Sequence, residues 1–255
     1  MSTKKFPILE FDPTREAMIE PGRIIKPVDI AEHCVLCFFH EVIGKVVARG
    51  AARLVVEIRW EDGPHPIYEV EHHGRRVAFF HPGIGSAFSA SLLEEVIAFG
   101  CRKFIAVGGC GVLDPQIGVG HLVVITSAVR DEGTSYHYLP PGSDASASPR
   151  AVAALEAALK RRALPYRLGR SWTTDAPYRE TAGKVAARRA QGCSVVEMEA
   201  AGLMAVTEFR AVDFGQVVYG GDDLSGPEWD HRDWHARSEI RADLFWLAVE
   251  ACLDL

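Results

Sequence analysis

Short apolar runs rich in β-branched residues alternate along this chain with longer segments of helical periodicity. Apolar runs of about four to eight residues are typical of buried strands, and apolar positions that recur every three or four residues are typical of amphipathic helices. Strands are predicted at 35–39, 54–60, 67–71, 77–81, 104–107, 122–128, 166–171, 195–197 and 214–219, and helices at 86–99, 149–163, 179–191, 199–209 and 231–253. This alternation predicts an α/β fold, with a sheet covered by helices.

The first part of the chain lacks this rhythm. Its first twenty residues carry two prolines and little periodicity, which is typical of an extended arm. We therefore expect an N-terminal arm over residues 1–33, wrapping the domain or a neighbouring subunit, and one domain over residues 34–255. The 255 residues contain 48 % hydrophobic side chains, enough for a full core.

Charge and composition narrow the partners. The chain has 28 Lys and Arg against 34 Asp and Glu, a net charge of -6, and no basic patch of the kind that nucleic-acid binders carry. No apolar run approaches the roughly 18 residues of a membrane span, and the N-terminus does not resemble a signal peptide. The six cysteines lie mostly in apolar segments, which suits a reducing compartment. We expect a cytoplasmic protein that binds a small molecule and contacts neither nucleic acid nor membrane.

Glycines follow the apolar run at 104–107, in the sequence FIAVGGCG. A dinucleotide-binding loop needs a third glycine, where this chain has Asp114, and a helix at once afterwards, where another strand is predicted. An NAD or FAD site is therefore disfavoured. Two interpretations stay open: a tight exit from the strand, or a close approach of backbone near Gly109 to a small ligand.

A second glycine turn, HPGIGSAFSASLLEEV, leads from a strand into a helix. Gly83 and Gly85 permit a sharp turn, and Ser86 is suited to cap the helix. The amides of the first helical turn would then face the sheet edge where open α/β sheets bind ligands. A purely structural cap and an anion site are equally compatible with this motif.

Five segments, in their order and spacing, resemble the nucleoside phosphorylase superfamily over roughly residues 34–250. They are HPGIGSAFSASLLEE, GCRKFIAVGGCGVLDPQIGVGHLVVITSAVRDEGTSYHY, TTDAPYRE, VVEMEAAGLMAV and VVYGGDDLSG. The resemblance implies a single three-layer α/β domain with a mixed, barrel-like central sheet flanked by helices. It also implies a homo-oligomer, and cleavage of the N-glycosidic bond of a nucleoside with phosphate or water as acceptor. No cofactor is implied, and phosphate would be a co-substrate.

The resemblance assigns roles to residues at both ends of that bond. In VVEMEAAG, it places Glu197, Met198 and Glu199 at the sugar, where Glu199 accepts hydrogen bonds from the two ribose hydroxyls and Met198 packs on the ring. A carboxylate suits this role because it offers two acceptor oxygens. A glutamate at a helix N-terminus beside a core methionine is the structural alternative.

At the base, the resemblance matches Asp222 of YGGDDLSG to an aspartate that protonates or hydrogen-bonds a purine ring nitrogen. Positioned acids of this kind lower the barrier to loss of an electron-rich leaving group. Uridine phosphorylases read the pyrimidine instead with Gln and Arg near TTDAPYRE, which has no glutamine here. A purine-type base is therefore favoured, and a pyrimidine nucleoside remains the alternative. Tyr178 is expected to stack on the base, although a plain surface tyrosine fits equally well.

The chain departs from the resembled phosphorylases where they hold phosphate. Three arginines of that site are missing, because the matching segments read CFFHEVIGK, FIAVGG and EDGPHP. A phosphate dianion normally needs several charge-assisted donors. An altered anion site built from His81, Gly85, Ser86, His65 and Arg23 is one alternative.

Water as acceptor is the other alternative. The related nucleosidases use a glutamate just after the first strand to activate water, and Glu41 lies in that region beside His40. Glu41 or His40 would then act as the general base, unless the pair is only a solvated loop. A protein that binds nucleosides without turnover is the non-enzymatic alternative.

One further motif has the spacing of metal ligands. His231 and His235 lie four residues apart in a predicted helix, which is a zinc-ligand spacing, but no third ligand is specified. No metal site is expected.

Overall fold

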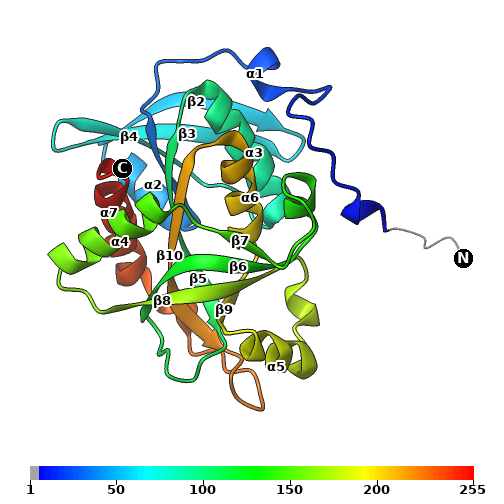
Figure 1. The fold of residues 1–255 in the computed structure, drawn as a ribbon. Helices are drawn as coiled ribbons and strands as arrows, with labels where there is room; N and C mark the ends of the chain where they lie inside the picture. The colour runs from blue at the N-terminus through cyan, green and yellow to red at the C-terminus, as the bar shows by residue number, and fades with distance from the viewer. Residues whose placement is uncertain (1–5) are drawn as a thin grey trace, which may run out of the picture.

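The computed structural model describes residues 6–255, apart from the side chain of His235. The predicted arm of residues 1–33 therefore has its first five residues outside the described part. Its described part contains the short helices η1 (Pro7–Leu9) and α1 (Pro21–Ile24), and it runs along the outside of the domain (Figure 1). Arg15 of the arm donates a hydrogen bond to the carbonyl of Phe209, and the Val28 amide donates to the Phe99 carbonyl at 3.1 Å.

In the described residues the strands form one mixed sheet in the order β10-β6-β8-β9-β5-β1-β4-β3-β2. Strand β10 also pairs with β5, so that β5, β10, β6, β8 and β9 close into a barrel. This confirms the expected mixed, barrel-like sheet. The strands are β1 (His33–Cys37), β2 (Ala52–Trp60), β3 (Gly63–His72), β4 (Arg75–Phe80), β5 (Lys103–Val112), β6 (Leu122–Asp131), β7 (Asp144–Ser146), β8 (Tyr166–Thr174), β9 (Cys193–Glu197) and β10 (Asp213–Asp223).

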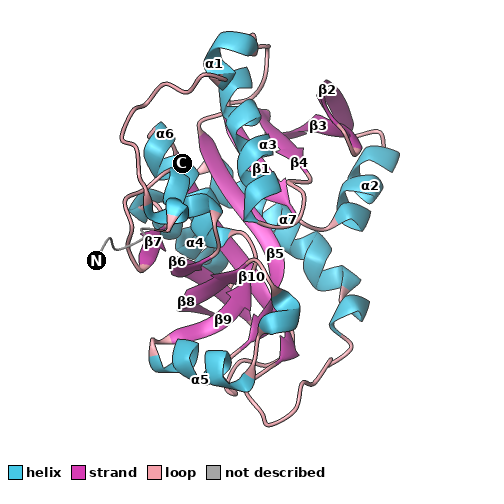
Figure 2. Cartoon of the chain, turned by 90° about the vertical axis from the view of Figure 1, so that its right-hand side faces the viewer, coloured by secondary structure: helices cyan, strands magenta, loops and turns pink. Residues whose placement is uncertain are grey.

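Helices cover both faces of the sheet, as Figures 1 and 2 show. Alternate side chains of each strand point to opposite faces, so Leu36 and Val218 pack toward α3 and α6 while Val35 and Val217 pack toward α4 and α7. Helix α5 lies apart, against a smaller cluster around Trp172. The helices are α2 (His40–Ala48), α3 (Ser86–Phe99), α4 (Pro149–Arg161), α5 (Ala182–Ala190), α6 (Ala200–Arg210) and α7 (Ser238–Leu253), with single turns η2 (Thr134–His137), η3 (Pro177–Arg179) and η4 (Trp234–Ala236).

The strand predicted at 104–107 continues through its glycines to Val112. A Cβ at Gly111 would lie 2.8 Å from both Leu224 and Val196, and one at Gly108 would lie 3.3 Å from the ring of Phe38. Glycine is thus required because neighbouring side chains occupy the space of a Cβ. The glycines do not form a tight strand exit. They lie within β5 and leave room for side chains of neighbouring segments.

One helix was not predicted, and two predicted helices begin later than expected. Helix α2 was not predicted, because the apolar run before it continues into buried Val42, Ile43 and Val46 and hides the change from strand to helix. The helix predicted at 179–191 begins at Ala182, after the 3-10 turn η3. The helix predicted at 231–253 begins at Ser238, because Arg232 and Asp233 adopt left-handed backbone with φ of 50° and 45°.

The first turns of α3 and α6 cross at two small residues. A Cβ on Gly202 of α6 would lie 2.8 Å from the Cβ and 2.9 Å from the Oγ of Ser86. We predict that Gly202→Ala lowers the free energy of unfolding by about 1–3 kcal/mol, because the two helix starts must separate. Chemical denaturation measures this.

The matched control is Gly44→Ala, an exposed position in α2 with no atom within 4 Å of an added Cβ. This change should raise stability by up to about 1 kcal/mol, because alanine favours helix over glycine. Equal effects of the two changes would contradict the proposed close contact.

Candidate active site

A cavity of about 400 Å³ opens where β1, β5, β9 and β10 leave the sheet. Among its lining residues are Gly109, Glu197, Met198, Glu199 and Asp222, which come from three separate segments of the sequence. The barrel closure between β5 and β10 brings them together, since Gly220 of β10 pairs with Cys110 of β5. The carboxylates of Glu199 and Asp222 therefore face one space.

Glu199 lies at the corner between β9 and α6. It is the residue before the first turn of α6, with an extended φ of -134°, and its side chain turns back to the start of α3. The Gly85 amide donates a hydrogen bond to Glu199 Oε1 at 2.6 Å. Burial, together with the negative charge of Glu197, raises the pKa of Glu199 to about 8. Near neutral pH, Glu199 therefore holds a proton.

Glu197, two residues earlier, has its oxygens occupied by the protein. Oε1 accepts from Ser171 Oγ at 2.9 Å and Thr173 Oγ1 at 2.6 Å, and Oε2 accepts from the amides of Glu199 and Ala200 at 2.7 and 2.6 Å. Burial raises its pKa, and these four donors oppose that rise. Because the donors favour the anion, Glu197 carries the negative charge of this pair and Glu199 the proton. These four donors anchor the Glu197 side chain at the cavity, and its contact with a sugar stays a prediction.

Asp222 lies near the end of β10 and also lines the cavity. Its Oδ2 accepts a hydrogen bond from Trp229 Nε1 at 2.7 Å. A second carboxylate, that of Glu180, also lines the cavity. Burial, and then the nearby charge of Asp222, raises the pKa of Glu180 to about 7. Two carboxyl groups, those of Glu180 and Asp222, therefore lie close to each other at this cavity.

The sequence analysis missed Glu180. The available signal was that it is the acidic residue that follows TTDAPYR, but the expected helix start at 179 made it look like a capping residue. The cap is in fact Thr181, whose Oγ1 accepts from the Lys184 amide at 3.4 Å. Glu180 is thereby free to face the cavity.

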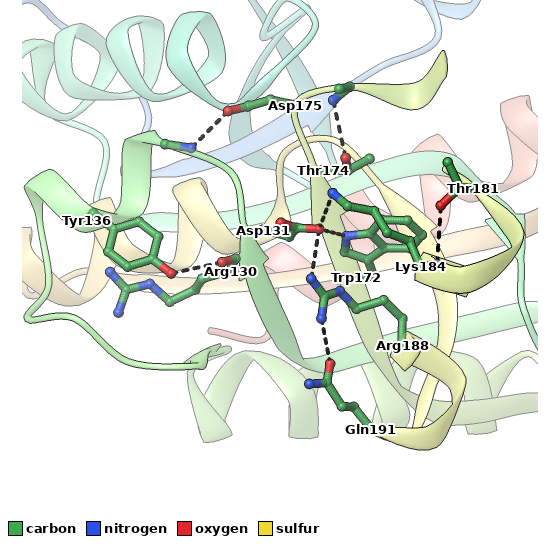
Figure 3. A network of polar contacts seen from close by, with 12 residues as sticks. Arg130, Asp131, Tyr136, Trp172, Thr174, Asp175, Thr181, Lys184, Arg188 and Gln191 are labelled. Carbon is green, nitrogen blue, oxygen red and sulfur yellow. Dashed lines mark hydrogen bonds and ion pairs between the residues drawn. The ribbon is translucent and has the colours of Figure 1, made fainter. Parts of the chain in front are cut away.

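A polar network holds helix α5 against the barrel, next to the turn that carries Glu180 (Figure 3). Asp131 Oδ2 accepts from Trp172 Nε1 at 2.9 Å, and it pairs with Lys184 Nζ at 3.1 Å and Arg188 Nη2 at 2.9 Å. Burial alone would raise the pKa of Asp131, but the two cations from α5 outweigh it and lower the pKa. Helix α5, and with it the adjacent Glu180, is therefore fastened to the barrel.

Arg241, in the first turns of α7, also lines the cavity and was not foreseen. Its Nη1 lies 2.8 Å from Glu41 Oε1, its Nε donates to Tyr219 Oη at 3.0 Å, and its guanidinium lies 5.3 Å from the centre of the Phe39 ring. Burial would raise the pKa of Glu41, but the hydrogen bond and charge of Arg241 lower it overall. Glu41 is therefore an anion beside the cavity.

The groups expected at the anion site have partners within the protein. The Gly85 amide is occupied by Glu199, and Ser86 Oγ donates to the Met198 carbonyl at 2.9 Å. His65 lies 3.0 Å from Asp62, and Arg23 lies in α1 of the arm, exposed and 2.6 Å from Glu16. The turn presents its first amides to the protein's own carboxylate, and so the structural alternative for this motif describes it better.

His40 and His81 lie together, with ring centres 5.9 Å apart. His81 Nδ1 accepts a hydrogen bond from the Gly83 amide at 3.1 Å. Burial, followed by the nearby His40, lowers the pKa of His81, so His81 is uncharged at neutral pH. It offers no positive charge to an anion there.

Tyr178 and His231, two other residues singled out in the sequence, lie outside the cavity lining. Tyr178 is 98 % exposed on η3 and does not line the cavity. The aromatic side chains that do lie at the cavity come from other segments: Phe38, Phe39 and Trp234. His231 precedes the start of α7, so the helical spacing that suggested a zinc pair with His235 does not exist.

The ionisable side chains that line the cavity are mostly acidic. Glu180, Glu197, Glu199 and Asp222 line it, and among the described lining residues only Arg241 is basic. The charge of Arg241 is matched by Glu41 at 2.8 Å. The cavity therefore favours a ligand with hydrogen-bond donors over a dianion.

A barrel-based α/β domain with carboxylates at both ends of one cavity suggests a protein that handles a polar ring compound. A model of the phosphorylase superfamily matches residues 32–254, and the chain belongs to this superfamily. The resemblance stated from the sequence motifs is thereby confirmed. None of the helices in the described residues combines the length and apolarity that a membrane crossing needs.

Individual relatives are distant and varied. The chain is 29 % identical to a uridine phosphorylase of Thermococcus kodakarensis over 69 % of its own length and 62 % of the relative's. It is 26 % identical to a purine nucleoside phosphorylase of Plasmodium vivax over 73 % of this chain and 78 % of that one. The match to the first of these spans about three-fifths of that protein.

The fold is shared with a solved structure, an AMP nucleosidase from Bacteroides thetaiotaomicron. The TM-score is 0.71 at 22 % identity, covering 88 % of this chain and 87 % of that chain. This likeness confirms the fold class expected from the sequence.

The proton on Glu199 links stability to pH. Between its ordinary pKa of 4.5 and about 8, the folded chain holds a proton that the unfolded chain has released. The free energy of unfolding should therefore fall as pH rises through this window, by roughly 1 kcal/mol per pH unit at most. Glu199→Gln should remove this part of the fall, as denaturation at several pH values would show.

The control is Glu208→Gln, an exposed position on the same helix, which should keep the wild-type pH profile. Glu199→Gln with an unchanged profile would mean that Glu199 is ionised throughout.

Proposed function

We propose that this chain cleaves the N-glycosidic bond of purine-type ribonucleosides and uses water as the acceptor. The observation that carries the proposal is that Glu199 and Asp222 line one cavity of about 400 Å³. A volume of this size is typical of small-molecule sites. We assign the sugar of the ligand to Glu199 and its heterocycle to Asp222.

At the sugar end, Glu199 hydrogen-bonds the two ribose hydroxyls and Met198 packs on the ring. The Gly85 hydrogen bond fixes the Glu199 carboxyl group, which limits the entropy lost on binding. At the base end, Asp222 and Glu180 face the purine. A carboxyl group of this pair is suited to give a proton to N7, because the leaving base becomes electron-rich as the bond to C1′ breaks.

In the proposed reaction, the C1′–N9 bond breaks and the oxygen of water bonds to C1′. One proton of the water passes to Glu41, with His40 as the alternative base, and the carboxyl pair of Asp222 and Glu180 gives a proton to N7. The products are ribose and the free purine. Glu41 suits the role of base because Arg241 keeps it ionised. Arg241 Nη1 lies 2.8 Å from Glu41 Oε1.

Water is favoured over phosphate by the charges of the cavity. Phosphate would enter a space lined by four acidic residues and by Arg241, which is already paired with Glu41. Desolvating a dianion there costs free energy that few donors offset. Phosphorolysis remains the alternative acceptor reaction, because both relatives are phosphorylases. A pyrimidine base remains the alternative to a purine, because one relative is a uridine phosphorylase.

We further propose that the chain works in the cytoplasm as a homo-oligomer. All six cysteines are unpaired thiols and buried, which suits a reducing compartment. Several large apolar side chains are exposed on the arm and on the neighbouring strand, namely Met18, Ile19, Ile24 and Trp60. A second copy would bury such a surface.

A product assay tests the acceptor and the base. The protein is incubated with adenosine, guanosine, inosine and uridine, with and without phosphate, and ribose, ribose 1-phosphate and free base are separated. We expect free ribose from purine nucleosides at a rate that phosphate does not change. Ribose 1-phosphate would overturn the water proposal, and no product from any nucleoside would favour a binding protein.

Substitution tests the acid. Asp222→Asn should lower kcat for the purine nucleoside by about 100- to 10,000-fold, because the neutral amide cannot donate a proton in the transition state. Asp213→Asn is the matched control. It lies at the other end of the same strand, paired with Arg150 at 2.8 Å, and should leave kcat unchanged. An Asp222→Asn variant with wild-type turnover would remove Asp222 from the mechanism.

A further inference from the structure

A second hollow of about 210 Å³ adjoins the base end of the cavity. It runs between α5 and the segment 224–229, and Glu180 lines both spaces. Trp229, which lines the hollow, donates its indole N–H to Asp222 in the cavity. The two spaces are therefore neighbours across one carboxyl pair. We call the second space the α5 groove.

About half of the wall of the α5 groove is apolar, and the charged side chains of Glu180, Arg189 and Glu228 also line it. Helix α5 contributes Val185 and Ala186, and the facing segment contributes Leu224, Pro227 and Trp229. The ring of Trp229 is held by its hydrogen bond to Asp222 Oδ2 at 2.7 Å, yet the residue is 61 % exposed. The apolar part of this wall offers a contact surface to a small apolar group.

Hydrogen bonds and ion pairs hold both sides of the groove, which are helix α5 and the segment 224–229. Arg189 Nη1 of α5 donates to the Ser225 carbonyl at 3.0 Å, which fastens the facing segment to the helix. Lys184 and Arg188 fasten the same helix to Asp131 of the barrel. An occupant would therefore find the walls already in place, without the cost of ordering them.

We propose that the α5 groove is a substrate subsite for an apolar substituent on the 6-position of the purine. This inference rests on the proposed function. In a purine, the 6-substituent and N7 lie on the same edge of the ring, so a base whose N7 faces Asp222 directs its 6-substituent along the Asp222–Glu180 pair and into the groove. A secondary amine at that position keeps one N–H to donate to Glu180.

The size of the groove limits the substituent. Liquid water occupies about 30 Å³ per molecule, so 210 Å³ holds about seven such volumes. An alkyl or aryl group of about five to seven heavy atoms therefore fits, and a benzyl group is a suitable probe. Since its burial removes apolar area from water, the benzylated nucleoside should bind about tenfold more tightly than adenosine.

The experiment compares kcat/KM for adenosine and N6-benzyladenosine in three proteins. The wild type should favour N6-benzyladenosine by about tenfold. Ala186→Trp places a large side chain from an exposed helix position into the groove and should abolish or reverse that ratio. Ala187→Trp is the matched control, since residue 187 is the next alanine of α5, exposed and outside the groove lining, and it should keep the wild-type ratio.

Two results would overturn the subsite while leaving the proposed function intact. One is cleavage of adenosine with little or none of N6-benzyladenosine in the wild type. The other is an equal change of the ratio in Ala186→Trp and Ala187→Trp.

If neither nucleoside is cleaved, calorimetric titration with adenine and N6-benzyladenine decides. Tighter binding of the benzylated base, lost in Ala186→Trp alone, supports the groove although the proposed catalysis has failed. Equal binding, or no binding of either base, overturns the groove.

Discussion

Four hydrogen bonds to the buried carboxylate of Glu197 fix the corner on which the cavity is built. Two come from side chains of β8 and two from amides at the start of α6, so a single anion joins a strand to a helix. An ion buried in this way is stable only when its oxygens are fully paired. Its charge has a second consequence, since it disfavours a second anion nearby and leaves the proton on Glu199.

The same electrostatics decide where the positive groups near the cavity find their partners. The helix start at Gly85, which suits an anion, already receives Glu199, and the arginine that enters the cavity from α7 is matched by Glu41. Positive potential is therefore used internally to order carboxyl groups. This arrangement suits a neutral nucleophile and a ligand rich in donor groups.

Closure of the barrel converts separate motifs into one site. The glycines of β5 let β10 and the neighbouring side chains approach closely, and this brings Asp222 opposite the Glu197–Glu199 corner. The base end is completed by α5, whose cations meet Asp131 on β6. A local charge network thus decides where Glu180 lies, and with it the boundary between the cavity and the α5 groove.

The sequence by itself determined the fold class, because apolar periodicity fixes which faces are buried and the motifs of residues 81–96, 196–202 and 219–226 carry the family resemblance. It also indicated that Glu199 and Asp222 belong to one site. Only the tertiary structure decided the neighbours of these groups. Arg241 and Glu180 carry no local signal, since a side chain on a helix or turn contacts the cavity only once the elements pack. Left-handed backbone at Arg232 and Asp233 likewise ended a helix that periodicity alone would extend. Local pattern records burial, whereas charge pairing and cavity shape depend on contacts between residues as far apart as Glu41 and Arg241.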